Sequence, residues 1–248
     1  MKAMILAAGV GSRLQPLTDE TPKALLNVGG VPMIERVIGH LKWAGVTELV
    51  VNLFHLGDHI VEFLASKGEF GLRIAFTRET ELLDTGGGLK NAAWFFDDDR
   101  PFFLHNVDVL SDIDLEGLFR FHHKVGALAT LAVQSRPGSR QLLFDRDGRL
   151  CGRDSPEGLE WAKGPPSNVG RFAFTGIHVI DPAIFPKMTE TGAFPITRTY
   201  LRLAGEGERI LAYRADGSYW QDIGSPEKLE AARKRAAGGT DVNAIRDS

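Results

Sequence analysis

The sequence predicts an α/β fold of three layers, with a mostly parallel central sheet and a small antiparallel β part. In the first half of the chain, short apolar runs alternate with segments of helical spacing, which is typical of βαβ units. In the second half, several strand-like runs follow one another with turn residues between them, which indicates antiparallel pairing.

The first strand is expected at residues 2–7, because an unbroken apolar run is typical of a strand covered on both faces. A helix should follow at 32–43, with Pro32 suited to its first turn. The remaining apolar runs of this half predict strands at 47–53, 71–77 and 101–106, and helices at 58–67, after Thr85–Gly88, and at 115–124.

The second half begins with a predicted strand at 127–135 and a hairpin at 140–150, whose turn residues are Asp147 and Gly148. Another strand is expected at 171–181. Ser225, Pro226 and Glu227 predict the N-cap and first turn of a last helix that ends near residue 237. No repeat or linker divides the chain, so we expect one domain over 1–237 and a loose polar tail over 238–248.

Composition excludes several classes of protein. The chain has 248 residues, of which 43% are hydrophobic and 25% charged, as in an ordinary globular domain with a sizeable core. A net charge of −3 argues against a general nucleic-acid surface. No apolar run approaches the roughly 18 to 20 residues of a membrane span and no leader pattern opens the chain, so we expect no membrane partner and a cytoplasmic location. The single cysteine, Cys151, fits a reducing compartment and a structural role.

The segment 8–22 leaves the carboxyl end of the first predicted strand, which is where open α/β sheets bind their ligands. Gly9 and Gly11 allow backbone N–H groups to approach a ligand closely. Arg13 and Lys23 add a guanidinium fork and a mobile ammonium, and this combination suits a polyphosphate. The alternative is a surface loop with incidental charges.

Two common phosphate-binding motifs do not describe this loop. The dinucleotide fingerprint G-x-G-x-x-G requires a third glycine, but Leu14 stands in that place and Pro16 follows soon after it. The P-loop pattern G-x-x-x-x-G-K-[ST] does not occur in the chain. Neither motif therefore accounts for the charges of this loop.

The stretch "LAAGVGSRLQPLTDETPKALLNVGGVPMI" (6–34) resembles the signature loop of the sugar-1-phosphate nucleotidyltransferases, L-A-[AG]-G-x-G-[ST]-R-L-x-P-L-T followed by P-K. "ETELLDTGGGL" (79–89) resembles the nucleotide-base loop of that family, and "FTGIHVI" (174–180) and "WQDIGSPEKL" (220–229) resemble its later motifs. The resemblance covers almost the whole chain. It implies a Rossmann-like, GT-A-like nucleotidyltransferase fold, and the short chain is most similar to compact bacterial members that make UDP-N-acetylmuramic acid or GDP-mannose-type products.

The resemblance also implies the reaction. The partners are a nucleoside triphosphate and a sugar 1-phosphate, whose oxygen attacks the α-phosphorus so that an NDP-sugar forms and pyrophosphate leaves. No general base is needed, because the second pKa of a phosphate monoester is about 6. Arg13 is assigned to the triphosphate and the leaving pyrophosphate, and Lys23 to the α-phosphate or sugar phosphate. The nucleotide-binding residues are then Ala7, Ala8, Gly9, Gly11, Ser12, Arg13, Gly86 and Gly87, those near the base acting through their backbone.

Mg²⁺ is the implied cofactor, since hard oxygen donors and several phosphates favour it. Its expected ligands are Asp108, at the end of an apolar strand, and Asp222, just before the last helix; a cap or turn role is the alternative for each. Lys163 and Gly176 are carried over to the sugar phosphate. Val107 departs from the Asn-Gly-Asp pattern of the family, and valine resists the conformations that glycine permits.

Two other functions remain open. The triplet Asp112-Ile113-Asp114 has the D-x-D pattern of metal-dependent glycosyltransferases, although it gives no reason for the Arg13 and Lys23 loop. A non-catalytic sensor of nucleotide sugars is the third possibility. The neighbouring aromatic residues Trp94, Phe95 and Phe96 are expected in the core.

Overall fold

The computed structural model describes residues 1–239, which form two compact units that alternate along the chain. The first unit contains Met1–Leu82, His105–Leu115 and the described residues from 218 onward. The second contains Leu83–Leu104 and Glu116–Gly217. The predicted mixed α/β fold is confirmed. The expectation of one nucleotidyltransferase domain over 1–237 stays a prediction.

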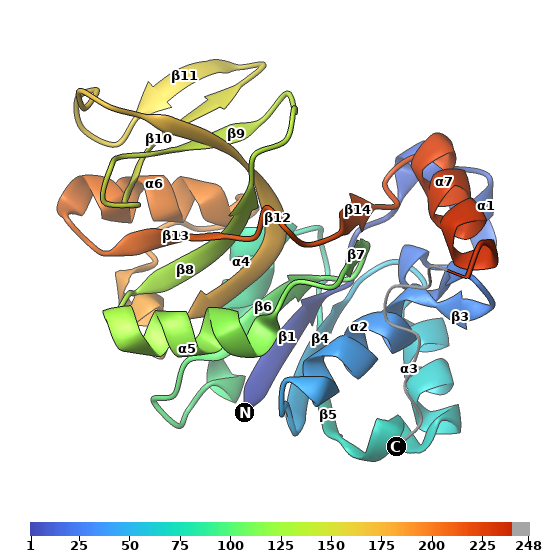
Figure 1. Ribbon diagram of the computed structural model, residues 1–248. Helices are drawn as coiled ribbons and strands as arrows, with labels where there is room; N and C mark the ends of the chain where they lie inside the picture. The colour runs from blue at the N-terminus through green and yellow to red at the C-terminus, as the bar shows by residue number, and fades with distance from the viewer. Residues whose placement is uncertain (240–248) are drawn as a thin grey trace. The chain divides into compact units, whose positions relative to one another are not determined.

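Three parallel strands form the sheet of the first unit. β1 (Lys2–Leu6) pairs with β4 (Glu48–Leu53), and β4 pairs with β5 (Arg73–Arg78). Nearly every residue of β1 and β4 is buried, as their unbroken apolar runs predicted. The connections run through α2 (Met33–Trp43) and α3 (Gly57–Ser66), and Figure 1 shows both helices on one side of these strands.

Short elements complete the first unit. The antiparallel pairs are β2 (Asn27–Val28) with β3 (Val31–Pro32), and β7 (Val109–Ser111) with β14 (Trp220–Asp222). The last helix, α7 (Pro226–Ala237), is capped by Ser225 as predicted, since the Ser225 hydroxyl accepts from the Lys228 N–H. The segment after β1, β2, α2, β7, the loop after β14 and α7 share one apolar cluster, made of Leu14, Leu26, Val28, Met33, Leu110, Ile223, Leu229 and Ala232.

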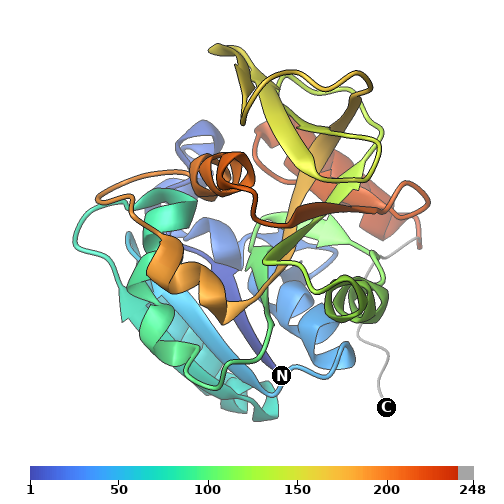
Figure 2. The same cartoon turned by 90° about the vertical axis from the view of Figure 1, so that its left-hand side faces the viewer.

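The second unit is built on antiparallel strands. β12 (Gly170–Ile180) pairs with β8 (Ala129–Gln134) and with β9 (Gln141–Phe144), and the sheet continues through β10 (Leu150–Ser155) to β11 (Gly158–Trp161). β13 (Ile210–Arg214) lies parallel to β8. The helix α6 (Ile196–Glu206) packs against β10, and Figure 2 shows it beside the yellow strands. Helices α4 (Asp84–Asn91) and α5 (Leu115–Val125) and the strand β6 (Phe102–Asn106) were expected from the sequence.

The structure corrects two expectations. The segment after β1 is not an open loop: it holds the helical turns η1 (Ser12–Leu14), α1 (Leu17–Glu20) and η2 (Lys23–Leu25), which are too short to give a periodic pattern. Of the three neighbouring aromatic residues, Phe95 and Phe96 are buried, but Trp94 is 58% exposed. The turn η4 (Ala93–Phe95) points successive side chains in different directions, so they cannot all face the core. The remaining short turns are η3 (Gly68–Gly71) and η5 (Pro182–Lys187).

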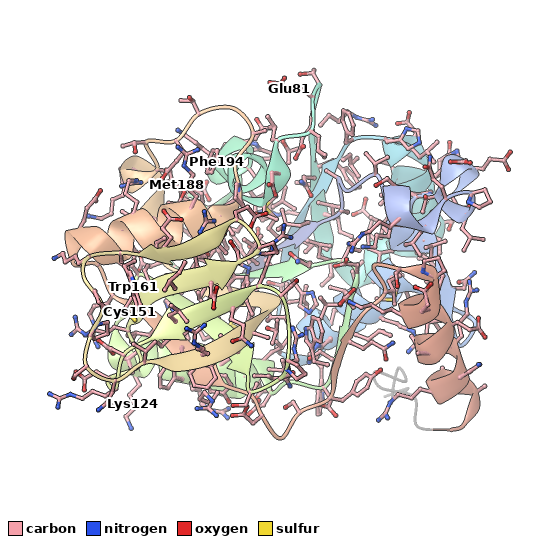
Figure 3. The ribbon with its side chains drawn as sticks, turned by 90° about the horizontal axis from the view of Figure 1, so that it is seen from above. Glu81, Lys124, Cys151, Trp161, Met188 and Phe194 are labelled. Atoms are coloured by element: carbon pink, nitrogen blue, oxygen red, sulfur yellow. The ribbon has the colours of Figure 1, made fainter. Side chains whose placement is uncertain are left out.

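Cys151 has the environment of a structural thiol. It is half-buried, its Sγ lies 3.3 Å from the carbonyl oxygen of Leu143, and burial raises its pKa to about 11. The thiol therefore stays protonated and weakly nucleophilic at neutral pH. Figure 3 shows it close to Trp161, on the strand next to its own.

Within residues 1–239, no helix combines the length and apolar character needed to cross a bilayer. The predicted tail begins with a turn at Gly238 and Gly239, and the rest of it lies outside the described residues.

Candidate active site

The loop after β1 is shaped by Gly11. Its φ of 71° lies in the left-handed region, and a Cβ atom placed there would be 2.9 Å from Cγ2 of Thr18. The Gly11 carbonyl accepts from the Leu14 N–H at 2.8 Å and from the Thr18 hydroxyl at 2.9 Å. Only glycine satisfies both the backbone angle and the close contact, and the resulting turn leaves Arg13 exposed.

Arg13 reaches the loop that follows β14. At Gly224, a Cβ atom would lie 3.0 Å from Nη2 of Arg13 and 2.8 Å from Oδ1 of Asp222. The Gly224 N–H also donates to that carboxylate oxygen at 2.9 Å. The guanidinium and the Asp222 carboxylate therefore share the space that is open because residue 224 has no side chain.

Asp108 lies close to both Lys23 and the Asp222 loop. Its carboxylate forms an ion pair with the Lys23 ammonium, and these side chains are only 23% and 12% exposed. Its carbonyl accepts from the Ile223 N–H at 3.0 Å, and the β7–β14 ladder places Asp222 opposite Val109. The backbone segments that hold the two predicted metal ligands, Asp108 and Asp222, therefore lie side by side.

Besides the nearby Arg13, a second basic residue lies at Asp222. It is Lys228, whose Nζ lies 2.5 Å from Oδ2 of Asp222. Partial burial tends to raise the pKa of Asp222, but the hydrogen bonds from Lys228 and from the Gly224 N–H outweigh it and bring the pKa below its ordinary value. Sequence reasoning missed Lys228. Its position in the first turn of a capped helix, six residues after Asp222, was the signal available.

The first unit therefore brings together three cations and two carboxylates, which are Arg13, Lys23, Lys228, Asp108 and Asp222. In the part of the chain that the structure describes, no group of three or more histidine, cysteine, aspartate or glutamate side chains could hold a metal ion. Two carboxylates alone fit Mg²⁺, which commonly takes one or two of them and completes its shell with phosphate oxygens and water.

Val107, which replaces a glycine of the family pattern, is accommodated without strain. It is buried, its N–H donates to the Leu6 carbonyl at 3.1 Å, and it is not among the residues with positive φ. Glycine's conformational freedom is therefore not required at this position.

The end of β1 contains a buried polar chain that the sequence did not indicate. The Ala7 N–H donates to Oδ1 of Asn52 at 2.7 Å, and Nδ2 of Asn52 donates to Oε1 of Glu79 at 2.7 Å. Asn52 and Glu79 are 2% and 8% exposed. Since the Ala7 N–H is already bonded, any contact with a base falls to other backbone atoms of Ala7 or Ala8.

Gly86 and Gly87 belong to the second unit, inside the first turns of α4. Their N–H groups donate to the Phe194 carbonyl at 2.9 and 3.4 Å, and a Cβ atom at Gly86 would lie 2.3 Å from the Phe194 ring. Figure 3 shows Phe194 beside this helix. Packing of the 192–194 segment explains these glycines, and their contact with a nucleotide stays a prediction.

Lys163 and Gly176 also belong to the second unit. Lys163 is exposed. Gly176 has a φ of 78° and lies where the pairing of β12 with β8 shifts register between Phe174 and His178, so a β-bulge explains the glycine. Their role toward a sugar phosphate stays a prediction.

The D-x-D triplet has a structural use. Oδ1 of Asp112 accepts from the Tyr219 N–H at 2.7 Å, and the Asp112 N–H donates to the Tyr219 carbonyl at 3.3 Å. These bonds extend the β7–β14 pairing, and nothing at the triplet favours the glycosyltransferase alternative.

A parallel α/β sheet, with Arg13 and Lys23 in the segment after its first strand and two carboxylates beside them, is typical of proteins that bind phosphorylated ligands at the carboxyl ends of their strands. Within that class, the chain belongs to the nucleotidyl transferase family, whose model matches residues 2–142.

The relatives act on different sugars. An N-acetylmuramate α-1-phosphate uridylyltransferase of Neisseria meningitidis serogroup B is 34% identical over 246 residues, covering 95% of this chain and 98% of its own. A mannose-1-phosphate guanyltransferase of Candida albicans is 32% identical over 237 residues, covering 92% of this chain. The chain spans 62% of the length of that fungal relative.

Solved structures confirm the fold. A UDP-glucose pyrophosphorylase complexed with UDP-glucose has a TM-score of 0.77 at 18% identity, covering 96% of this chain and 98% of its own. HddC from Yersinia pseudotuberculosis, complexed with GMP-PN, has a TM-score of 0.73 at 20% identity, covering 94% and 98%.

Proposed function

We propose that this protein is a sugar-1-phosphate nucleotidyltransferase, which couples a nucleoside triphosphate to a sugar 1-phosphate and releases pyrophosphate. The observation that carries the proposal is the meeting of Arg13, Lys23, Asp108 and Asp222 in the first unit of a chain that belongs to the nucleotidyl transferase family. A phosphate-binding loop alone would suit many ligands. Two carboxylates beside it suit a reaction that also needs a divalent cation.

In the proposed reaction, an oxygen of the sugar phosphate forms a bond to the α-phosphorus, and the bond from that phosphorus to the oxygen shared with the β-phosphate breaks. All reactants are anions, so the main task of the protein is to position them and to reduce their repulsion. Arg13 suits the β- and γ-phosphates, because its fork binds two oxygens at once. Lys23 suits the transferred α-phosphate, since its ammonium is compact and held at the site by Asp108.

Mg²⁺ is the proposed cofactor, with Asp108 and Asp222 as its protein ligands. When bound, it would neutralise phosphate charge in the reactants and in the leaving pyrophosphate. Asp222 is held ready by the Gly224 N–H on Oδ1, which fixes the direction of the carboxylate.

The relatives favour two substrate pairs: UTP with N-acetylmuramate 1-phosphate, and GTP with mannose 1-phosphate. The Neisseria relative has nearly the same length as this chain, which favours the first pair. A cytoplasmic location is proposed with it, where nucleoside triphosphates are available, and the net charge of −3 suggests no nucleic-acid partner.

The test is a screen of four nucleoside triphosphates against a panel of sugar 1-phosphates, with Mg²⁺ present and pyrophosphate measured. Release that requires both substrates supports the proposal. Consumption of a UDP- or GDP-sugar with an acceptor, without pyrophosphate release from any pair, would favour a glycosyltransferase. Binding of a nucleotide sugar without either reaction would favour a sensor.

A further inference from the structure

Each of the two proposed metal ligands forms an ion pair with a lysine in this structure. The Lys23 ammonium is paired with Oδ2 of Asp108, and the Lys228 ammonium lies 2.5 Å from Oδ2 of Asp222. Lys23 comes from the signature loop. Lys228 comes from the first turn of α7 and has no part in the reaction described above.

We propose that Lys228 is a positioning residue. Its ammonium pairs with the Asp222 carboxylate while no divalent cation is bound, and it moves to the substrate phosphates when the cation binds. This inference rests on the proposed function. It concerns the order in which the site is filled, and it makes binding of the cation depend on binding of the polyphosphate.

The Lys228–Asp222 ion pair is not needed to hold α7 in place. The helix is fixed by its Ser225 cap, by a 2.7 Å hydrogen bond from Nε2 of Gln221 to the Lys228 carbonyl, and by Leu229 and Ala232 in the apolar cluster. The Lys228 side chain is 50% exposed, so its ammonium can leave Asp222 without unfolding the helix.

The two carboxylate oxygens of Asp222 have different partners. Oδ1 accepts from the Gly224 N–H, which comes from the same loop and cannot leave without moving the backbone. Oδ2 accepts from Lys228, which ends a flexible side chain. Oδ2 is therefore the oxygen that an incoming cation can take, and the ammonium must move off it because like charges repel.

The displaced ammonium needs a new anion. Without substrate, a divalent cation would join a site that already holds Arg13, Lys23 and Lys228, and Coulomb repulsion would weaken its binding. A polyphosphate supplies oxygens for all of these cations at once. The cation and the polyphosphate should therefore bind cooperatively, and Lys228 should contribute to the coupling between them.

The test compares Lys228→Gln with the wild-type protein in two titrations. Manganese alone, followed by electron paramagnetic resonance of free Mn²⁺, should bind the variant roughly tenfold more tightly, because the competing charge is gone. Inorganic tripolyphosphate with saturating Mn²⁺, followed by calorimetry, should bind the variant roughly tenfold more weakly. A purely structural lysine would not move the two affinities in opposite directions.

Two further variants serve as controls. Lys228→Arg keeps the charge and should bind Mn²⁺ as the wild type does. Lys234→Gln removes an exposed charge from the same helix and should change neither affinity. Far-ultraviolet circular dichroism checks that each variant is folded.

Unchanged or weaker Mn²⁺ binding by folded Lys228→Gln would overturn the proposal. Mn²⁺ binding that survives Asp222→Asn unchanged would also overturn it, because the ion would then lie elsewhere. The enzymatic proposal is tested separately by the pyrophosphate screen: opposite shifts in the two titrations support the exchange at Asp222 even if no substrate pair in that screen reacts.

Discussion

The guanidinium of Arg13 lies against Gly224, where a Cβ atom would be 3.0 Å from Nη2. Oδ1 of Asp222 would lie 2.8 Å from the same Cβ. A residue with no side chain thus allows Arg13, the proposed ligand of the triphosphate, and Asp222, a proposed metal ligand, to approach each other.

Gly224→Ala should therefore impair function more than folding. The backbone angle at 224 does not require glycine, and both crowded atoms end side chains, so the main cost is the hydrogen bond from the Gly224 N–H to Oδ1 of Asp222, and the free energy of unfolding should change by less than about 2 kcal/mol. Displacement of Arg13 and Asp222 should weaken triphosphate binding at least roughly tenfold. Urea unfolding and calorimetry measure the two effects. Gly217→Ala, with no atom within 4 Å of the new Cβ, is the control, and equal affinities in the two variants would contradict the assignment.

Lys23→Ala should act mainly on turnover. In the proposed reaction, Lys23 lies where negative charge gathers between the nucleophile and the α-phosphorus, so its loss should lower kcat roughly 10²-fold or more with little change in triphosphate affinity. Steady-state rates and calorimetry on the same sample measure both. A near-normal kcat would show that Lys23 does not stabilise the transition state.

Asp108→Asn and Asp222→Asn should each lower the rate by orders of magnitude while the fold persists, because an amide is a much weaker ligand for Mg²⁺ than a carboxylate. Rates are measured as Mg²⁺ is varied, and circular dichroism checks the fold. Asp147→Asn, in the exposed β9–β10 turn, is the matched control. If either site variant equals the wild type at limiting Mg²⁺, that residue is not a ligand.

Gly86→Ala should destabilise the second unit. The new Cβ would meet the Phe194 ring at 2.3 Å and the Phe194 carbonyl oxygen at 2.8 Å, and such overpacking costs roughly 1–3 kcal/mol. Denaturant unfolding measures the loss, and Gly138→Ala, whose nearest contact is 3.7 Å, is the control. Adding Phe194→Leu should recover part of the loss. Equal stability of the Gly86→Ala and Gly138→Ala variants would show that the 192–194 segment can move aside without a loss of stability.

Three buried histidines predict a loss of stability in mild acid. Burial lowers the pKa of His40 to about 4, of His105 to about 3 and of His122 to about 4. In the unfolded chain these groups titrate near 6.5, so between pH 6.5 and about 4 the unfolded chain binds more protons and stability falls as the pH falls. Each group contributes up to about 1.4 kcal/mol per pH unit.

The measurement is urea unfolding at pH 7, 6 and 5. His40→Gln removes one titrating group and keeps a donor for the Ile113 carbonyl, which lies 3.0 Å from Nε2 of His40. Its stability should fall less steeply with pH than that of the wild type. Identical slopes would mean that His40 does not contribute to the acid sensitivity.

Features that depend only on residues close together along the chain could be predicted from the sequence alone. The strand at 2–7, the helix at 32–43 and the cap at Ser225 follow from apolar runs, helical spacing and local hydrogen bonding. The loop holding Arg13 and Lys23 was identified for the same reason: its glycines, its charges and its place after a strand are all local. The short turns within it were missed, because three or four residues give no period.

Only the tertiary structure decided which of these side chains meet. Lys228 pairs with Asp222, Gly224 makes room for Arg13, Asn52 binds the Ala7 N–H, and Phe194 fills the space at Gly86. Most of these pairs join segments far apart in the chain, and one residue of each pair had no predicted role. Such contacts arise from the packing of whole elements around a shared core, which residue spacing does not encode. The sequence therefore determined the kind of site, and the packing decided how its charges are paired.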